Sequence, residues 1–133
     1  MNIEPFVYDY VINEVDYPDG TVIMEEGGRG RWIYIVLEGR VRVMKRTLTG
    51  MVCVDTLGPG EIFGEMVFLE GSEGPRSASV IAQREVKVGI LDTERLNRDY
   101  QAMPLRLRAL FHSLMIELKE VTSRVCSAVS GSS

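Results

Sequence analysis

Glycine is confined to one part of the chain, and this distribution constrains the fold more than any other feature. Of the 13 glycines, twelve lie between Gly20 and Gly89, and none lies between Ile90 and Ser130. Glycine favours turns and disfavours helix interiors. The sequence therefore predicts a first part built from short segments joined by frequent turns, followed by a helical second part.

Apolar and polar residues alternate within the glycine-rich part. The alternation is clear over residues 33–37 and 41–43, where Arg40 and Arg42 occupy the positions that face away from Val41. A period of two is typical of half-buried strands. Residues 51–54 and 86–91 have the same character. Turn sequences separate these runs at residues 18–20, 27–30, 38–39, 49–50 and 58–60.

Many short strands with closely spaced turns favour a jelly-roll β-barrel over alternating strand and helix units. We expect a mainly β fold with flanking helices, in which residues 17–91 form the barrel. Residues 1–28 carry seven acidic and no basic residues. We expect residues 1–16 to form an N-terminal arm beside the barrel, either as a solvated segment or as a short helical element.

Two helices are expected after the barrel, over residues 92–129. Asp92 or Thr93 can cap a first helix that ends near Ala102, because Pro104 enforces a break. The tail, residues 130–133, is small and polar and should fray. The second helix carries an apolar seam with spacings of 4 and 3 residues, formed by Leu107, Phe111, Leu114, Leu118, Val121, Val125 and Ala128.

This seam has two interpretations. It can pack against the chain's own barrel, or it can be the seam of a dimer, because it spans about three heptads. The alternatives imply different partners. If the seam packs on the barrel, the partner is an unidentified protein, whereas a dimer seam implies a homodimer.

Composition excludes several classes of function. With 133 residues, 45% hydrophobic and 26% charged, the chain fits one soluble domain, residues 1–133. Two cysteines, Cys53 and Cys126, form no disulfide framework and suit a reducing cytoplasm, which is the expected location. Only one histidine, His112, is present. We therefore expect no metal centre, no catalytic triad and no cofactor.

Charge and hydropathy also limit the expected partners. No apolar run approaches the roughly 18 residues of a spanning helix, so we expect no membrane partner. The net charge of −4 argues against a nucleic-acid backbone as the main partner.

The segment over residues 58–80 carries the chemistry. Gly64 precedes a short apolar turn, where outward-pointing backbone N–H groups can bind an anion. Arg76 adds a planar guanidinium suited to paired phosphate oxygens, and Ser77 adds a hydroxyl. Glu65 suits a sugar hydroxyl that donates to it. Together they indicate a ligand with both a phosphate and a sugar.

Each residue also has an ordinary explanation. An acidic residue such as Glu65 is favourable in the first turn of a helix because of the helix dipole alone. A lone arginine is usually solvated. Glu65 and Arg76 can also simply form an exposed ion pair, typically worth about 1 kcal/mol or less. The pattern, and not any single residue, decides.

As a set, these residues resemble the cyclic nucleotide-binding domain family, which includes the bacterial catabolite activator proteins and the regulatory subunits of cyclic AMP-dependent kinase. The resemblance covers roughly residues 17–125. It rests on residues 18–27, 34–43 and 59–66, and above all on Phe63-Gly-Glu65 combined with Pro75-Arg-Ser-Ala78. That combination is similar to the family's phosphate-binding cassette.

The resemblance implies roles for these residues. Glu65 is expected to accept from the ribose 2′-hydroxyl, while Arg76, Ser77 and the N–H groups around Gly64 hold the cyclic phosphate. The interval from Glu65 to Arg76 is 76 − 65 = 11 positions, slightly longer than is common in the family, which indicates a looser loop. The cassette residues expected at the ligand are Phe63, Gly64, Glu65, Met66, Arg76, Ser77 and Ala78.

Base recognition is expected on the second helix. Thr122 and Ser123 resemble a Thr-Ser pair that reaches the adenine in the catabolite activators, although two such residues near a helix end are also ordinary solvent-facing residues. Cyclic AMP is the expected ligand. Cyclic GMP is an alternative, because the hydroxyl of Ser77 can face a guanine amino group.

The resemblance implies a non-catalytic regulatory module that binds a cyclic nucleotide and transmits binding through its C-terminal helix. One alternative is an interaction domain of the same fold, with an empty pocket or another effector such as cyclic GMP or a cyclic dinucleotide. Another is a cupin-type metalloenzyme, because the barrel class overlaps. Its usual histidine-rich centre cannot be assembled from His112 alone.

Overall fold

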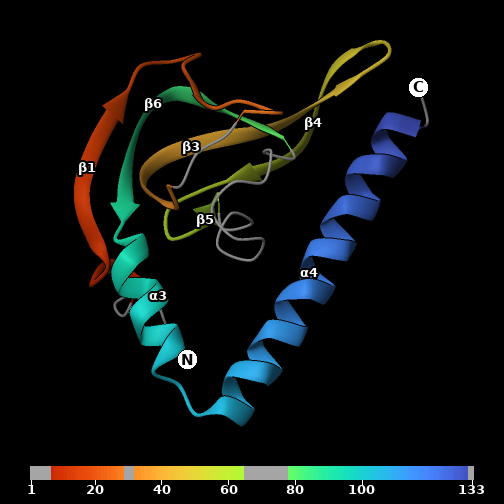
Figure 1. Cartoon of the computed structure of the whole chain (residues 1–133). Helices are drawn as coiled ribbons and strands as arrows, with labels where there is room; N and C mark the ends of the chain where they lie inside the picture. The colour runs from red at the N-terminus through yellow and green to blue at the C-terminus, as the bar shows by residue number, and fades with distance from the viewer. Residues whose placement is uncertain (1–6, 29–31, 65–77, 132–133) are drawn as a thin grey trace.

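The structure, a computed structural model, describes residues 7–28, 32–64 and 78–131. On α4 it describes the side chains up to Glu117 and, beyond that, only the side chain of Arg124. The described part contains a sheet followed by two helices (Figure 1). The strands are β1 (Val11–Tyr17), β2 (Val22–Met24), β3 (Tyr34–Thr47), β4 (Gly50–Leu57), β5 (Ile62–Phe63) and β6 (Ser79–Leu91), and the helices are α3 (Thr93–Gln101) and α4 (Leu105–Gly131).

The strands form one antiparallel, jelly-roll-like sheet, which confirms the expected fold class. Its hydrogen-bonded order is β1-β6-β3-β4, with β2 added to β6 and β5 added to β3. The long strands β3 and β6 curve together, and the shorter strands lie along their edges (Figure 1).

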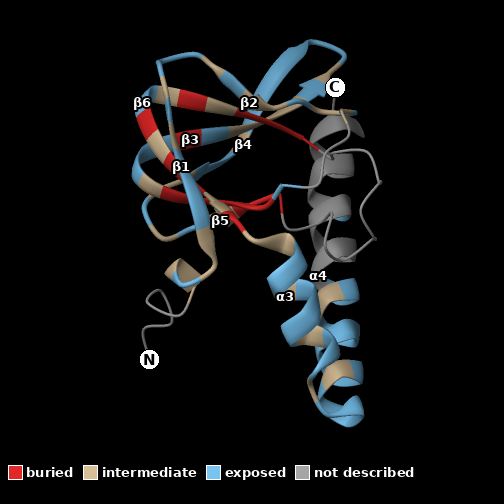
Figure 2. Ribbon diagram, turned by 60° about the vertical axis from the view of Figure 1, so that its left-hand side comes forward, coloured by how far each residue is buried: buried red, intermediate tan, exposed pale blue. Residues whose placement is uncertain are grey.

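The larger core cluster lies on the shared inner face of β3 and β6, and a smaller, separate cluster is formed by Ile33, Ile35 and Leu91. Figure 2 shows buried residues concentrated on these two strands, whereas α3 and the start of α4 are largely exposed. Alternation explains the two clusters, because consecutive side chains of a strand point to opposite faces, and Val36 belongs to the larger cluster whereas Ile35 belongs to the smaller one. The largest fully buried side chains are Ile35, Val36, Val41, Val80 and Val88.

Glu38-Gly39 is not a turn between two strands, as the sequence suggested, but a bend inside the continuous strand β3. The pairing of β3 with β6 shifts register on both sides of Glu38. Gly39 has φ +84°, and Arg84 on β6 has φ +62°. Positive φ serves a β-bulge as well as a turn, so the glycine alone did not distinguish the two.

The predicted N-terminal arm, residues 1–16, is too long, because β1 already begins at Val11 and pairs with β6. Val15 and Tyr17 pack against the core cluster, while Glu14 and Asp16, which alternate with them, are exposed. The acidic residues suggested a solvated segment, but they occupy only the outer face of an edge strand.

Helix α3 begins and ends where the sequence predicted. The side chain of Asp92 caps it by accepting a hydrogen bond from the backbone N–H of Arg95 at 3.1 Å, and Ala102 is its C-terminal cap. Tyr10 fixes the helix to the N-terminal turn. Its hydroxyl donates to Asp99 at 2.5 Å, and the guanidinium of Arg95 lies 4.8 Å from its ring centroid.

Helix α4 runs to Gly131, past the predicted end at residue 129, so the first two residues of the predicted tail are helical. Figure 1 shows it diverging from α3 and running back toward the β3–β4 hairpin, and it contacts both strands. At the start of the apolar seam, Leu107, Phe111 and Leu114 are 43%, 44% and 50% exposed. This half of the seam does not pack on the barrel.

No helix in the described part of the chain combines the length and the apolar character needed to cross a membrane.

Gly39→Ala should lower the free energy of unfolding by about 2 to 5 kcal/mol, because a Cβ would lie 2.5 Å from the carbonyl oxygen of Glu85 at an unfavourable φ. Gly20→Ala is the matched control, since Gly20 has φ +80° but no atom within 4 Å of an added Cβ. It should cost only about 1 to 2 kcal/mol. Urea unfolding measures both. Equal losses would contradict the close approach of β6 at Gly39.

Tyr10→Phe should lower the free energy of unfolding by about 1 kcal/mol at neutral pH, because it removes the hydrogen bond to Asp99. That bond raises the pKa of Tyr10 above its ordinary value of 10.0. The raised pKa favours the neutral hydroxyl in the folded state. The contribution is therefore complete below about pH 10 and is lost as the pH rises through the folded-state pKa.

The measurement is the difference in urea stability between parent and variant at several pH values. Tyr17→Phe serves as the control for the effects of alkali on the rest of the chain. A Tyr10→Phe difference that stays constant far above pH 10 would show that the hydroxyl does not act through this bond.

Candidate functional site

The N-terminal end of the cassette, which comprises residues 58–80, is hydrogen-bonded to β3. The turn over residues 58–61 closes through the backbone N–H of Gly58, which donates to the Glu61 carboxylate at 2.6 Å. Gly60 N–H donates to the carbonyl oxygen of Val36 at 2.8 Å, and Val36 N–H donates to that of Glu61 at 2.9 Å. The turn that begins the cassette is thus hydrogen-bonded to Val36, which is fully buried in the core.

Phe63 anchors this end through its ring. It is buried and stacks on Tyr34, with ring centroids 4.8 Å apart and an interplanar angle of 14°. Stacked aromatic pairs add about 0.5 to 1.5 kcal/mol beyond their buried area. Gly64 follows, is buried, and has φ +84°, a conformation that favours glycine. The chain therefore enters the cassette in a defined direction.

The C-terminal end of the cassette is also buried. Ala78 is 4% and Ser79 5% exposed, and Ser79 pairs with Met44 near the far end of β3. The hydroxyl oxygen of Ser79 accepts a hydrogen bond from the backbone N–H of Glu26 at 2.8 Å. Both cassette ends are thus attached to the same strand, ten residues apart.

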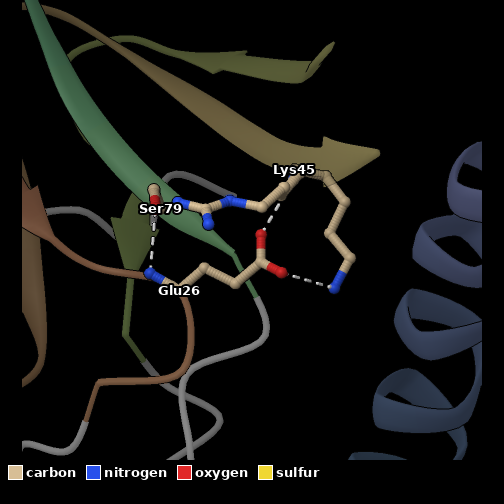
Figure 3. A network of polar contacts seen from close by, with 4 residues as sticks. Glu26, Lys45 and Ser79 are labelled. Atoms are coloured by element: carbon tan, nitrogen blue, oxygen red, sulfur yellow. Dashed lines mark hydrogen bonds and ion pairs between the residues drawn. The ribbon is translucent and has the colours of Figure 1, made fainter. Parts of the chain in front are cut away.

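The Glu26 side chain ties its loop to β3. One carboxylate oxygen accepts from the backbone N–H of Arg46 at 2.9 Å, and the other lies 3.2 Å from the ammonium nitrogen of Lys45. Figure 3 shows Glu26 joining Ser79 to Lys45, whose ammonium group lies on the α4 side of the network. One loop residue therefore joins the two strands next to the cassette.

The structure places three of the predicted site residues: Phe63, Gly64 and Ala78, all buried at the two ends of the cassette. Glu65, Met66, Arg76 and Ser77 lie outside the described residues. Thr122 and Ser123 lie on α4, but their side chains are outside the described set. The ligand roles of all nine residues remain predictions.

Sequence reasoning missed the supporting contacts. Tyr34 and Glu26 fall within the segments that carry the family resemblance, and Ser79 directly follows one of them, but no local pattern indicates that they contact the cassette or its neighbours. Among the described residues, no group of three or more His, Cys, Asp or Glu side chains is arranged to hold a metal ion.

The chain belongs to the cyclic nucleotide-binding domain family, whose sequence profile matches residues 14–102. Among its relatives is the Cyclic AMP receptor protein of Thermus thermophilus, 39% identical over 99 residues, which are 74% of this chain and 43% of that protein. Another is the cAMP-dependent protein kinase regulatory subunit of Aspergillus fumigatus, 35% identical over 66% of this chain and 19% of that protein. The chain thus spans less than half the length of either relative.

Solved structures agree with the sequence match. The crystal structure of the Thermus thermophilus Catabolite Activator Protein superposes with a TM-score of 0.69 and 31% identity, over 94% of this chain and 58% of that one. The cGMP-bound form of the EAL enzyme Bd1971 superposes with a TM-score of 0.72 and 28% identity, over 88% of this chain and 31% of that one. The resemblance inferred from the cassette motif is therefore confirmed.

Proposed function

We propose that this chain is a non-catalytic sensor domain that binds cyclic AMP in the cassette, residues 58–80, and transmits binding through α4. The observation that carries the proposal is the fixed geometry of both cassette ends on β3. The names of the two relatives support the choice of ligand, because one is a cyclic AMP receptor and the other a regulatory subunit of a cAMP-dependent kinase.

The chemistry of the cassette explains how cyclic AMP would be selected. A 3′,5′-cyclic phosphate carries one negative charge, which one guanidinium, that of Arg76, can match. It also leaves the ribose 2′-hydroxyl free to donate to Glu65. A ligand without that hydroxyl would leave a desolvated carboxylate unpaired, which is costly. Thr122 and Ser123 would complete the site from α4 by facing the base.

Cyclic GMP is the second candidate ligand. Bd1971 has been solved in a cAMP-bound form and in a cGMP-bound form, and both superpose on this chain. The hydroxyl of Ser77 supplies a group that can face the guanine amino group. Titration with both nucleotides separates the two ligands, and binding of neither would favour an interaction domain with another effector.

We also propose that the chain forms a homodimer through α4. The exposed first half of the seam presents Leu107, Phe111 and Leu114 on one side of the helix, at the 4-and-3 spacing of a helix pair. Because the same helix carries Thr122 and Ser123, a nucleotide that orients α4 would also bias the geometry of the dimer.

Arg76→Ala should weaken cyclic AMP binding by about 2 to 5 kcal/mol, because it removes one partner of a charge-assisted, desolvated contact. Glu65→Ala should cost less. Isothermal titration measures both, and Arg42→Ala, which removes an exposed arginine of β3, is the control.

A thermal melt tests recognition of the cyclic phosphate in the same proteins. Cyclic AMP at 100 times its dissociation constant should stabilise the parent by about 2.7 kcal/mol, whereas linear 5′-AMP should not. Equal shifts from both nucleotides, or a folded Arg76→Ala variant that titrates like the parent, would show that the cassette assignment is wrong.

Leu114→Glu should convert the dimer to a monomer, because it places an unpaired charge in the seam. Ile116→Glu is the matched control. Ile116 is also exposed, at 41%, but two helical positions rotate it about 200° away from Leu114. Sedimentation equilibrium across micromolar concentrations, with and without cyclic AMP, measures the state. A monomeric parent under both conditions would exclude the homodimer and leave a different protein as the partner.

A further inference from the structure

Ser79 is an unexpected residue at its position. It is the buried polar residue of the described part, and it begins β6 between Ala78 and Val80, which are both buried. A small polar side chain gains little from a strand core, and a buried hydroxyl is unfavourable unless it is hydrogen-bonded. The bond accepted from Glu26 N–H at 2.8 Å satisfies that hydroxyl oxygen. The contact therefore accounts for a serine at the end of the cassette.

Glu26 is itself held in place by its side chain. Its two carboxylate oxygens are bound to Lys45 and to the backbone of Arg46, and both charged side chains are largely removed from solvent, with relative exposures of 19% for Lys45 and 26% for Glu26. Such a pair is screened less than an exposed ion pair. The backbone N–H that Glu26 donates to Ser79 is thus fixed relative to the end of β3.

We propose that Glu26 and Ser79 are positioning residues for the nucleotide site. They would hold the start of β6, and so the chain direction at Ala78, in the geometry that Arg76 and Ser77 need to meet the phosphate. The inference rests on the proposed function. Consecutive Cα atoms are about 3.8 Å apart, so Ser79 lies only three short steps from Arg76. A site held in its binding geometry before the ligand arrives binds more tightly, because less ordering remains.

A purely structural role makes a different prediction. If the network only stabilises the fold, its loss lowers the melting temperature but leaves the dissociation constant unchanged at temperatures where the variant is fully folded. If the network positions the cassette, the dissociation constant rises at those temperatures as well, because only a fraction of the folded molecules is competent to bind.

The test measures dissociation constants for cyclic AMP and cyclic GMP by isothermal titration, at a temperature where circular dichroism shows each variant to be fully folded. Ser79→Ala removes the acceptor, and we expect an increase of about three- to tenfold in the dissociation constant. Ser79→Thr keeps the hydroxyl and should restore the parent value to within about twofold. Glu38→Gln is the charge control, because Glu38 is 73% exposed and lies 4.0 Å from Lys87, outside the network.

Glu26→Ala provides a second route if threonine does not fit at position 79. It should raise the dissociation constant by a similar factor. The double variant with Ser79→Ala should have about the same dissociation constant as the weaker-binding single variant, because the two residues act as one unit. Multiplied effects in the double variant would overturn the inference, as would parent-like affinity in folded Ser79→Ala. A parent that binds neither nucleotide would overturn the proposed function, and the inference with it.

Discussion

The pairing of β3 with β6 is the constraint on which the rest of the structure depends. These strands, 14 and 13 residues long, share a ladder whose inner face holds the fully buried Val36, Val41 and Val88. Burying one such side chain contributes about 1.5 to 3 kcal/mol. Every other strand in the described part pairs with one of these two. The pairing of β3 with β6 therefore determines where each end of the cassette lies.

The bend in β3 determines how the cassette ends lie relative to each other. Phe63 pairs with Tyr34 before the bend, and Ser79 pairs with Met44 after it. Gly39 lies at the bend, and on β6 the positive-φ residue Arg84 is held by its backbone N–H, which donates to the Asp19 carboxylate at 2.6 Å. A straight strand would separate the two attachment points by about 33 Å. The relative position of the two cassette ends thus depends on residues outside the cassette.

Local patterns predicted the long strands, the cap of α3 and the family of the chain, because each of these depends on residues close together in sequence. The sequence alone predicts a turn at Gly39, because a glycine with positive φ occurs in turns and in β-bulges alike, and only the pairing with the opposite strand distinguishes them. β1 was missed because acidic residues alternate with Val15 and Tyr17. The role of Glu26 was not visible either, because its partners Lys45 and Ser79 are 19 and 53 residues away. Polar contacts between residues far apart in the chain produce no repeating pattern of residue types, so a single sequence does not reveal them.

A small set of hydrogen bonds joins α3 to α4. Helix α3 is fixed by Leu96, which packs on the core, and by Tyr10. Across the joint, the Tyr100 hydroxyl donates to the carbonyl oxygen of Arg108 at 3.2 Å, and the Arg108 guanidinium donates to Gln101 at 2.8 and 3.1 Å. Such bonds contribute about 0.5 to 1.5 kcal/mol each. Coupling energies between sites are typically about 1 to 3 kcal/mol. Under the proposed function, a ligand preference for one orientation of α4 by that amount would match the free energy of one or two of these bonds, and the ladder of β3 and β6 would not need to change.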